Sequence, residues 1–156
     1  MKIIDAHLHF SKIKSFIDTA EKKSFVDYSY NGLVQEFTQN NIIFGIAMGL
    51  EETTDGAFPD EGAINPMGIN LDNNINKNLA FCLGINPIAL IKNKHKSLQN
   101  IEKSIQNEKV VGLKIYAGYY PFYVYDEVYH SIYELAEKYS LPVVMHSGDT
   151  YSERGL

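Results

Sequence analysis

The opening segment, MKIIDAHLHF, places one acid and two imidazoles at every second position. Asp5, His7 and His9 are separated by single apolar residues. Because neighbouring side chains of a β-strand point to opposite faces, these three share one face. Two neutral imidazoles at this spacing can converge on one divalent metal ion such as zinc, whose bonds to histidine nitrogen are about 2.0–2.1 Å long. An amphipathic edge strand with a solvated polar face explains the same pattern, so both interpretations stay open for this segment taken alone.

A lysine occupies one face of a second apolar segment. In residues 110–118, VVGLKIYAG, the alternation puts Lys114 on the same face as Gly112 and Tyr116. This face points inward if the sheet curls into a barrel. A buried ammonium group that stays unpaired costs several kcal/mol. We therefore predict that Lys114 neutralises Asp5 or binds a carboxylate of a substrate.

A third histidine comes near the end of a later apolar segment. Residues 141–148 read LPVVMHSG, with His146 close to the carboxyl end. In a barrel of eight parallel strands, the first and fifth strands face each other across the axis. We therefore predict that His146 completes a divalent metal site begun by His7 and His9.

The elements that must position these residues alternate between strands and helices. Short apolar runs predict five strands of a largely parallel sheet, at 2–10, 41–50, 79–87, 110–118 and 141–148. Residues 126–140 have the period of an amphipathic helix, which we expect Asp126 to cap. We expect Ser97 to cap another helix, and the apolar residues of 33–37 indicate a third. The repeated strand–helix order predicts an α/β fold.

The chain length of 156 residues fits one domain with its own hydrophobic core. Within this domain, residues 51–78 are acidic, rich in Gly, Pro and Asn, and without clear periodicity. Connections longer than about 12–15 residues are usually lids, binding loops or disordered segments. We interpret 51–78 as an insertion loop after the second strand, which fits a lid and a plain solvated insertion equally well.

Composition and charge narrow the choice of partners. A formal net charge of -5 argues against nucleic acid, whose backbone attracts basic surfaces. No apolar run approaches the roughly 20 residues that cross a bilayer, and the start of the chain lacks the apolar core of a signal peptide. Cys82 is the only cysteine, which excludes an intrachain disulfide, and we expect it in the core. These features predict a cytoplasmic protein that acts on a small molecule, with no nucleic-acid or membrane partner.

Three motifs together resemble the amidohydrolase superfamily of metal-dependent hydrolases. They are DAHLHF at 5–10, GLKIY at 112–116 and PVVMHSGDT at 142–150. The chain looks most similar to the branch that includes metal-dependent decarboxylases of the aminocarboxymuconate-semialdehyde type. The resemblance implies a (β/α)₈ TIM barrel with one or two divalent ions, commonly Zn²⁺ with Mn²⁺ as the alternative, at its carboxyl-terminal face. It also implies His7, His9 and His146 as the metal ligands.

The resemblance implies an activity as well as a fold. It predicts a hydrolase in which metal-activated water attacks a small carbonyl or carboxylate substrate, with decarboxylation as the alternative reaction. In some branches the lysine at this strand is carboxylated and bridges two metals; we predict an unmodified Lys114, with Lys114 and Asp5 as the catalytic residues. Tyr116, Tyr119 and Tyr120 suit a wall that binds the substrate, although packing on the barrel rim explains them equally well.

The resembled pattern also has parts that this sequence lacks. It includes a histidine on the sixth strand and an aspartate on the eighth, in barrels of about 250 residues. The sequence provides about five of the eight β/α units of a TIM barrel, so we predict an incomplete barrel. The outer strands of such a barrel carry unpaired backbone groups. Residues 150–153 have the form of a helix capping box, close to the end of the chain. We expect either the N-terminal portion of a longer enzyme or a homo-oligomer that covers the open sheet edge.

Two further interpretations stay open. Metal-dependent DNases of the TatD type also begin with a His-x-His strand, but they carry a glutamate where Lys114 stands, and a charge of -5 suits a nuclease poorly. The other interpretation is a non-catalytic remnant or interaction module that keeps the half-barrel without binding metal. The absent acidic ligand favours this remnant, whereas the presence of His7, His9 and His146 disfavours it.

Overall fold

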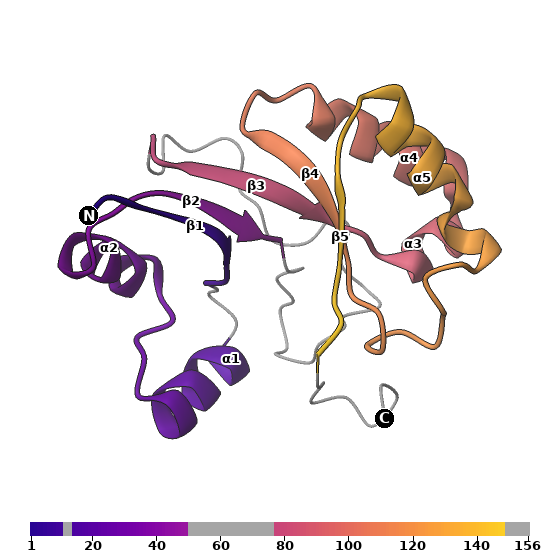
Figure 1. Ribbon diagram of the computed structural model, residues 1–156. Helices are drawn as coiled ribbons and strands as arrows, with labels where there is room; N and C mark the ends of the chain where they lie inside the picture. The colour runs from indigo at the N-terminus through magenta and orange to yellow at the C-terminus, as the bar shows by residue number, and fades with distance from the viewer. Residues whose placement is uncertain (11–13, 50–76, 149–156) are drawn as a thin grey trace.

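A computed structural model describes residues 1–10, 14–49 and 77–148 of the chain (Figure 1). Apart from its last two residues, the predicted insertion loop at 51–78 lies outside these ranges. The predicted helix start at 150–153 also lies outside them. Both remain predictions.

Five parallel strands form one sheet, in the order in which they follow along the chain (Figure 1). They are β1 (Ile3–Leu8), β2 (Ile42–Met48), β3 (Leu79–Gly84), β4 (Val110–Ile115) and β5 (Val143–Met145). Each lies within one of the predicted runs, so the five predicted strands are confirmed. A parallel sheet in sequential order curls in one direction, as in a (β/α)₈ barrel. The described strands form a curled half-barrel, which confirms the predicted incomplete TIM barrel.

Helices connect the strands and cover the sheet. They are α1 (Lys14–Thr19), α2 (Tyr30–Gln39), α3 (Pro87–Lys92), α4 (Lys94–Ile105) and α5 (His130–Lys138). Helix α1 continues into a π-helical turn at Ala20–Ser24, and α5 follows a 3₁₀ turn at Glu127–Tyr129. Figure 1 shows α3, α4 and α5 grouped on the side of β3 to β5, and α1 and α2 near the start of the chain. Within the described ranges, no helix combines the length and the apolar character needed to span a membrane.

Of the two predicted helix caps, Ser97 is wrong, and Asp126 takes the N-cap position without making a side-chain capping bond. Ser97 lies inside α4, where its hydroxyl donates a hydrogen bond to a carbonyl of α3 at 2.9 Å. Asn93 caps α4 instead, because its side chain accepts a hydrogen bond from the Lys96 amide at 3.1 Å. Asp126 precedes the 3₁₀ turn, but its carboxylate accepts from the Tyr123 amide at 2.9 Å. The tertiary bond of Ser97 and the local bond of Asp126 thus take the place of the capping bonds that sequence spacing predicts.

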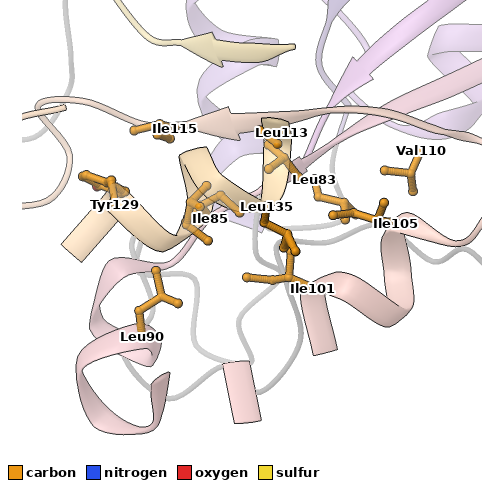
Figure 2. Close-up of a cluster of buried hydrophobic side chains, with 12 residues drawn as sticks. Leu83, Ile85, Leu90, Ile101, Ile105, Val110, Leu113, Ile115, Tyr129 and Leu135 are labelled. Atoms are coloured by element: carbon orange, nitrogen blue, oxygen red, sulfur yellow. The ribbon is translucent and has the colours of Figure 1, made fainter. Parts of the chain in front are cut away.

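The main hydrophobic core lies between the sheet and helices α3 to α5 (Figure 2). Leu113 and Ile115 of β4 pack there against residues such as Ile101 of α4 and Leu135 of α5. Since side chains alternate along a strand, this packing leaves Lys114 on the opposite face of β4. A smaller core around Phe37 holds α2 against the sheet.

Asn86 fixes the start of α3 directly after β3. Its side-chain oxygen accepts hydrogen bonds from the amides of Ile88 at 2.9 Å and Ala89 at 3.2 Å. Replacing Asn86 with Ala should lower the free energy of unfolding by about 1 kcal/mol. For a chain of this size, that loss lowers the Tm by about 2–4 °C, measurable by circular dichroism. Asn86→Asp keeps the acceptor and should lose less; equal losses in the two variants would contradict a capping role.

Both outer strands of the described sheet have a backbone edge that no other described strand pairs with. Large apolar side chains are exposed on both, with Ile4 of β1 63% exposed and Met145 of β5 42% exposed. Exposed strand edges favour pairing with further strands. The predicted association at this edge stays a prediction.

Candidate functional site

The carboxyl ends of the strands gather the candidate residues at one end of the half-barrel. His9 directly follows β1, Tyr116 directly follows β4 and His146 directly follows β5. Parallel strands present their carboxyl ends on the same side of a sheet, which is where TIM-barrel enzymes carry their sites. His7 lies two residues before the first of these ends, on the same strand face as His9.

His7 and His9 present their ring nitrogens to each other. The Nε2 atoms of the two rings are 3.1 Å apart. Two nitrogens bound at 2.0–2.1 Å to a tetrahedral zinc ion lie about 3.4 Å apart. The observed separation is close to this value, so the pair fits the donor set of a divalent metal ion.

His146 is held near this pair by the backbone of β4. Its amide donates a hydrogen bond to the carbonyl of Ile115 at 2.9 Å. The charge of His146 contributes to lowering the pKa values of both His7 and His9, which places the three rings in one electrostatic neighbourhood. As the side chains lie, however, no three His, Cys, Asp or Glu residues in the described ranges are grouped to hold a metal. The fold therefore supplies a histidine pair with the third histidine nearby.

The surroundings keep both imidazoles of the pair neutral near pH 7. Burial, followed by the charges of His7, Lys114 and His146, lowers the pKa of His9 to about 4. The pKa of His7 is also lowered, first by desolvation and then by Lys114, while Asp5 opposes this shift. The neutral ring is the form that binds metals. Both histidines are thus in the correct state to act as ligands.

Lys114 lies in the interior, as the alternation in β4 predicted. The residue is 0% exposed, and its Nζ has no hydrogen-bond partner in the described part of the chain. Burial lowers its pKa, and the neighbouring Cys82 thiol acts in the opposite direction. The structure does not bring Lys114 to Asp5, whose carboxylate accepts a hydrogen bond from the His7 amide at 3.0 Å. Catalytic roles for Lys114 and Asp5 stay predictions.

The predicted tyrosines split into two groups. Tyr116 and Tyr119 stand edge to face with ring centroids 5.8 Å apart, and the ring of Tyr119 lies 5.2 Å from that of His146. Gly118 has a φ of 84°, which lets the loop turn between these two tyrosines. Tyr120 is buried with Tyr116 in a small apolar cluster. The structure thus places Tyr116 and Tyr119 beside the histidines and packs Tyr120 against Tyr116. A substrate-binding role for the three tyrosines stays a prediction.

Sequence reasoning missed Tyr28 as a member of this aromatic group. Burial and the neighbouring Tyr119 raise the pKa of Tyr28 to about 12, and Tyr28 in turn acts on Tyr116. Tyr28 lies in the irregular segment before α2, so it follows no helical or strand period. In the sequence, the feature that could have pointed to Tyr28 is the second tyrosine, Tyr30, on the other side of Ser29, the N-cap of α2. Cys82 is buried as predicted, and its position beside Lys114 was not foreseen.

A family comparison covers nearly the whole chain. The family model of the TatD-related DNases matches residues 4–154. The chain belongs to this family. The match includes β1 to β5 and all three candidate histidines of this TatD-related chain.

A solved structure resembles the TatD-related chain in fold. It is the crystal structure of a probable 2-pyrone-4,6-dicarboxylic acid hydrolase from Acinetobacter baumannii with citric acid bound. The TM-score is 0.50 at 14% sequence identity, and the alignment covers 94% of this chain and 50% of that chain. The TatD-related chain thus spans about half the length of this structural relative. No curated protein matches the sequence.

The family match changes the order of the sequence-based interpretations. A metal-dependent hydrolase family was predicted, but the TatD type was ranked second, on the lysine at position 114 and the net charge of -5. One residue and an overall charge weigh less than a match over residues 4–154. The similarity to the decarboxylase-containing branch stays a prediction for this TatD-related chain.

Proposed function

We propose that this chain carries the metal-binding half of a metal-dependent hydrolase. The observation that carries the proposal is the 3.1 Å separation of the Nε2 atoms of His7 and His9, at the carboxyl end of β1. His146 would be the third ligand, since it follows β5 at the same end of the half-barrel. Three nitrogen donors suit Zn²⁺, with Mn²⁺ as the alternative.

The bound ion would supply a hydroxide near neutral pH, because it lowers the pKa of a coordinated water to about 7. The protein's own residues would prepare the site for that chemistry. Burial keeps His9 in the neutral form that binds metal. The rings of Tyr116 and Tyr119, beside His146, would exclude water and orient the substrate.

A small carbonyl or carboxylate compound is the substrate class that we propose. The aromatic rings around His146 favour a compact substrate, and the net charge of -5 opposes a polyanion. A phosphodiester is the second candidate, favoured by the match to a family of DNases.

The working enzyme, in this proposal, covers the open edges of β1 and β5. The exposed Ile4 and Met145 and the unpaired edges of the described sheet support an added layer there. Either further strands of a longer chain or a second copy of this chain would supply it.

Turnover assays on the full chain, loaded with Zn²⁺ or Mn²⁺, test the proposal. We expect hydrolysis of a lactone such as dihydrocoumarin that stops with EDTA and falls by about 100-fold or more in His146→Ala. His130→Ala is the matched control, because His130 is exposed on α5. Hydrolysis of bis(4-nitrophenyl) phosphate with the same dependence would assign the phosphodiester class. Activity that survives both EDTA and His146→Ala would contradict the proposal.

A further inference from the structure

Two buried nitrogens near the candidate site have no hydrogen-bond acceptor among the described residues. They are Nζ of Lys114 and Nδ1 of His9. Both groups lie beside Tyr116: Nζ of Lys114 is 5.2 Å from the centroid of its ring, and the centroid of the His9 ring is 6.5 Å from it. Buried polar groups in folded proteins almost always have a partner, and those that do not require an explanation. Here both groups can donate, and both lack an acceptor.

The described neighbours of Lys114 do not meet this need. The ring of Tyr116 lies 5.2 Å from Nζ, which gives a cation–π contact but accepts no strong hydrogen bond. The nearest acid along β1, Asp5, accepts from the His7 amide instead. The thiol of Cys82 is a weak acceptor. An ammonium group left in this state costs several kcal/mol, and an anion that reaches it removes the cost.

His9 has a reason of its own to need an acceptor. Its Nε2 faces His7, in the direction expected for a metal ligand. A histidine that binds metal through one nitrogen normally donates a hydrogen bond from the other. The described residues therefore offer no acceptor to Nδ1 of His9, just as they offer none to Nζ of Lys114.

We propose that Lys114 and His9 together bind the oxyanion of a planar organic acid, whose flat body lies against Tyr116 and Tyr119. Carboxylate and phosphate oxygens both accept charge-assisted hydrogen bonds from a lysine and an imidazole. The edge-to-face rings of Tyr116 and Tyr119 offer a surface for a planar group. The inference names the substrate class of the proposed hydrolase and rests on that function for the reaction, whereas the binding step needs no metal.

Binding of benzoate to the full, EDTA-treated chain tests the inference, with benzamide as the neutral comparison and phenyl phosphate as the second oxyanion. Benzoate should bind more tightly than benzamide, and Lys114→Met should raise its Kd by about tenfold or more. Lys96→Met, which alters an exposed lysine of α4, should leave the Kd unchanged. The tighter of benzoate and phenyl phosphate identifies the oxyanion. If neither oxyanion bound more tightly than benzamide, or if the Kd of the tighter one were unchanged in Lys114→Met, the inference would be overturned.

A second measurement covers the case in which Lys114→Met does not fold. In the wild-type chain labelled with ¹³C at the lysine Cε, the Lys114 signal, assigned by its absence from Lys114→Arg, should shift with benzoate and not with benzamide. No shift would overturn the inference. Zinc binding measured in parallel separates the two proposals: anion binding without zinc binding contradicts the hydrolase, and zinc binding without anion binding contradicts only the inference.

Discussion

Replacing His9 with Ala should weaken Zn²⁺ binding by at least about 100-fold, because removal of groups that only support metal ligands already costs 10–100-fold. His9 provides one of the two Nε2 atoms that lie 3.1 Å apart, and burial keeps its ring neutral. Without this nitrogen, His7 has no nearby imidazole on its own strand. Competition with a chromophoric zinc chelator measures the change, and metal-dependent turnover should fall with it.

His130→Ala is the control for this experiment, since His130 is exposed on α5 and follows no strand. Its zinc affinity should equal that of the unmodified chain. Circular dichroism of His9→Ala should show an intact fold, because removal of a ring at the end of β1 leaves both hydrophobic cores unchanged. An affinity of His9→Ala close to that of the control would refute the role of His9.

Replacing Ile115 with Ala should lower the free energy of unfolding by about 2–5 kcal/mol. Ile115 is 0% exposed, and its side chain belongs to the main core (Figure 2). Its carbonyl also accepts the hydrogen bond from the His146 amide. The cavity left by alanine should therefore loosen the end of β4 where it holds His146. Urea unfolding followed by circular dichroism measures the loss.

Two comparison variants define this prediction. Ile115→Val removes one methylene group and should cost only about 0.5–1.5 kcal/mol. Ile91→Ala alters an exposed isoleucine of α3 and should change stability by less than about 0.5 kcal/mol. If Ile115→Ala were no more destabilising than Ile91→Ala, the core described around β4 would be wrong.

The order and class of the strands could be predicted because buried parallel strands leave a plain signal. Runs such as 79–87 and 110–118 are apolar enough to be recognised without any neighbour. Helix starts were harder, because Asn93 and Ser97 are both good caps, and only the tertiary bond from Ser97 to α3 decides between them. A side chain that bonds outside its own helix cannot be read from spacing.

The part of the candidate site that lies on strands could be predicted, because strand alternation decides which face each side chain occupies. Alternation in β1 places His7 and His9 on one face, and alternation in β4 places Lys114 in the interior. Tyr28 could not be found, because its electrostatic interactions with Tyr116 and Tyr119 join segments that lie far apart in sequence. Asp5 and Lys114 looked complementary by charge, yet the carboxylate of Asp5 accepts a hydrogen bond from the His7 amide at 3.0 Å. Local backbone contacts decided that case.

The metal content of the purified full chain is the most direct test of the central claim. Inductively coupled plasma mass spectrometry after incubation with Zn²⁺ or Mn²⁺ and desalting should give about one tightly bound ion per chain. The joint variant His7→Ala and His9→Ala should give none. A metal-free chain, or equal metal content in the two proteins, would contradict a metal site built on His7 and His9 and would favour a non-catalytic role.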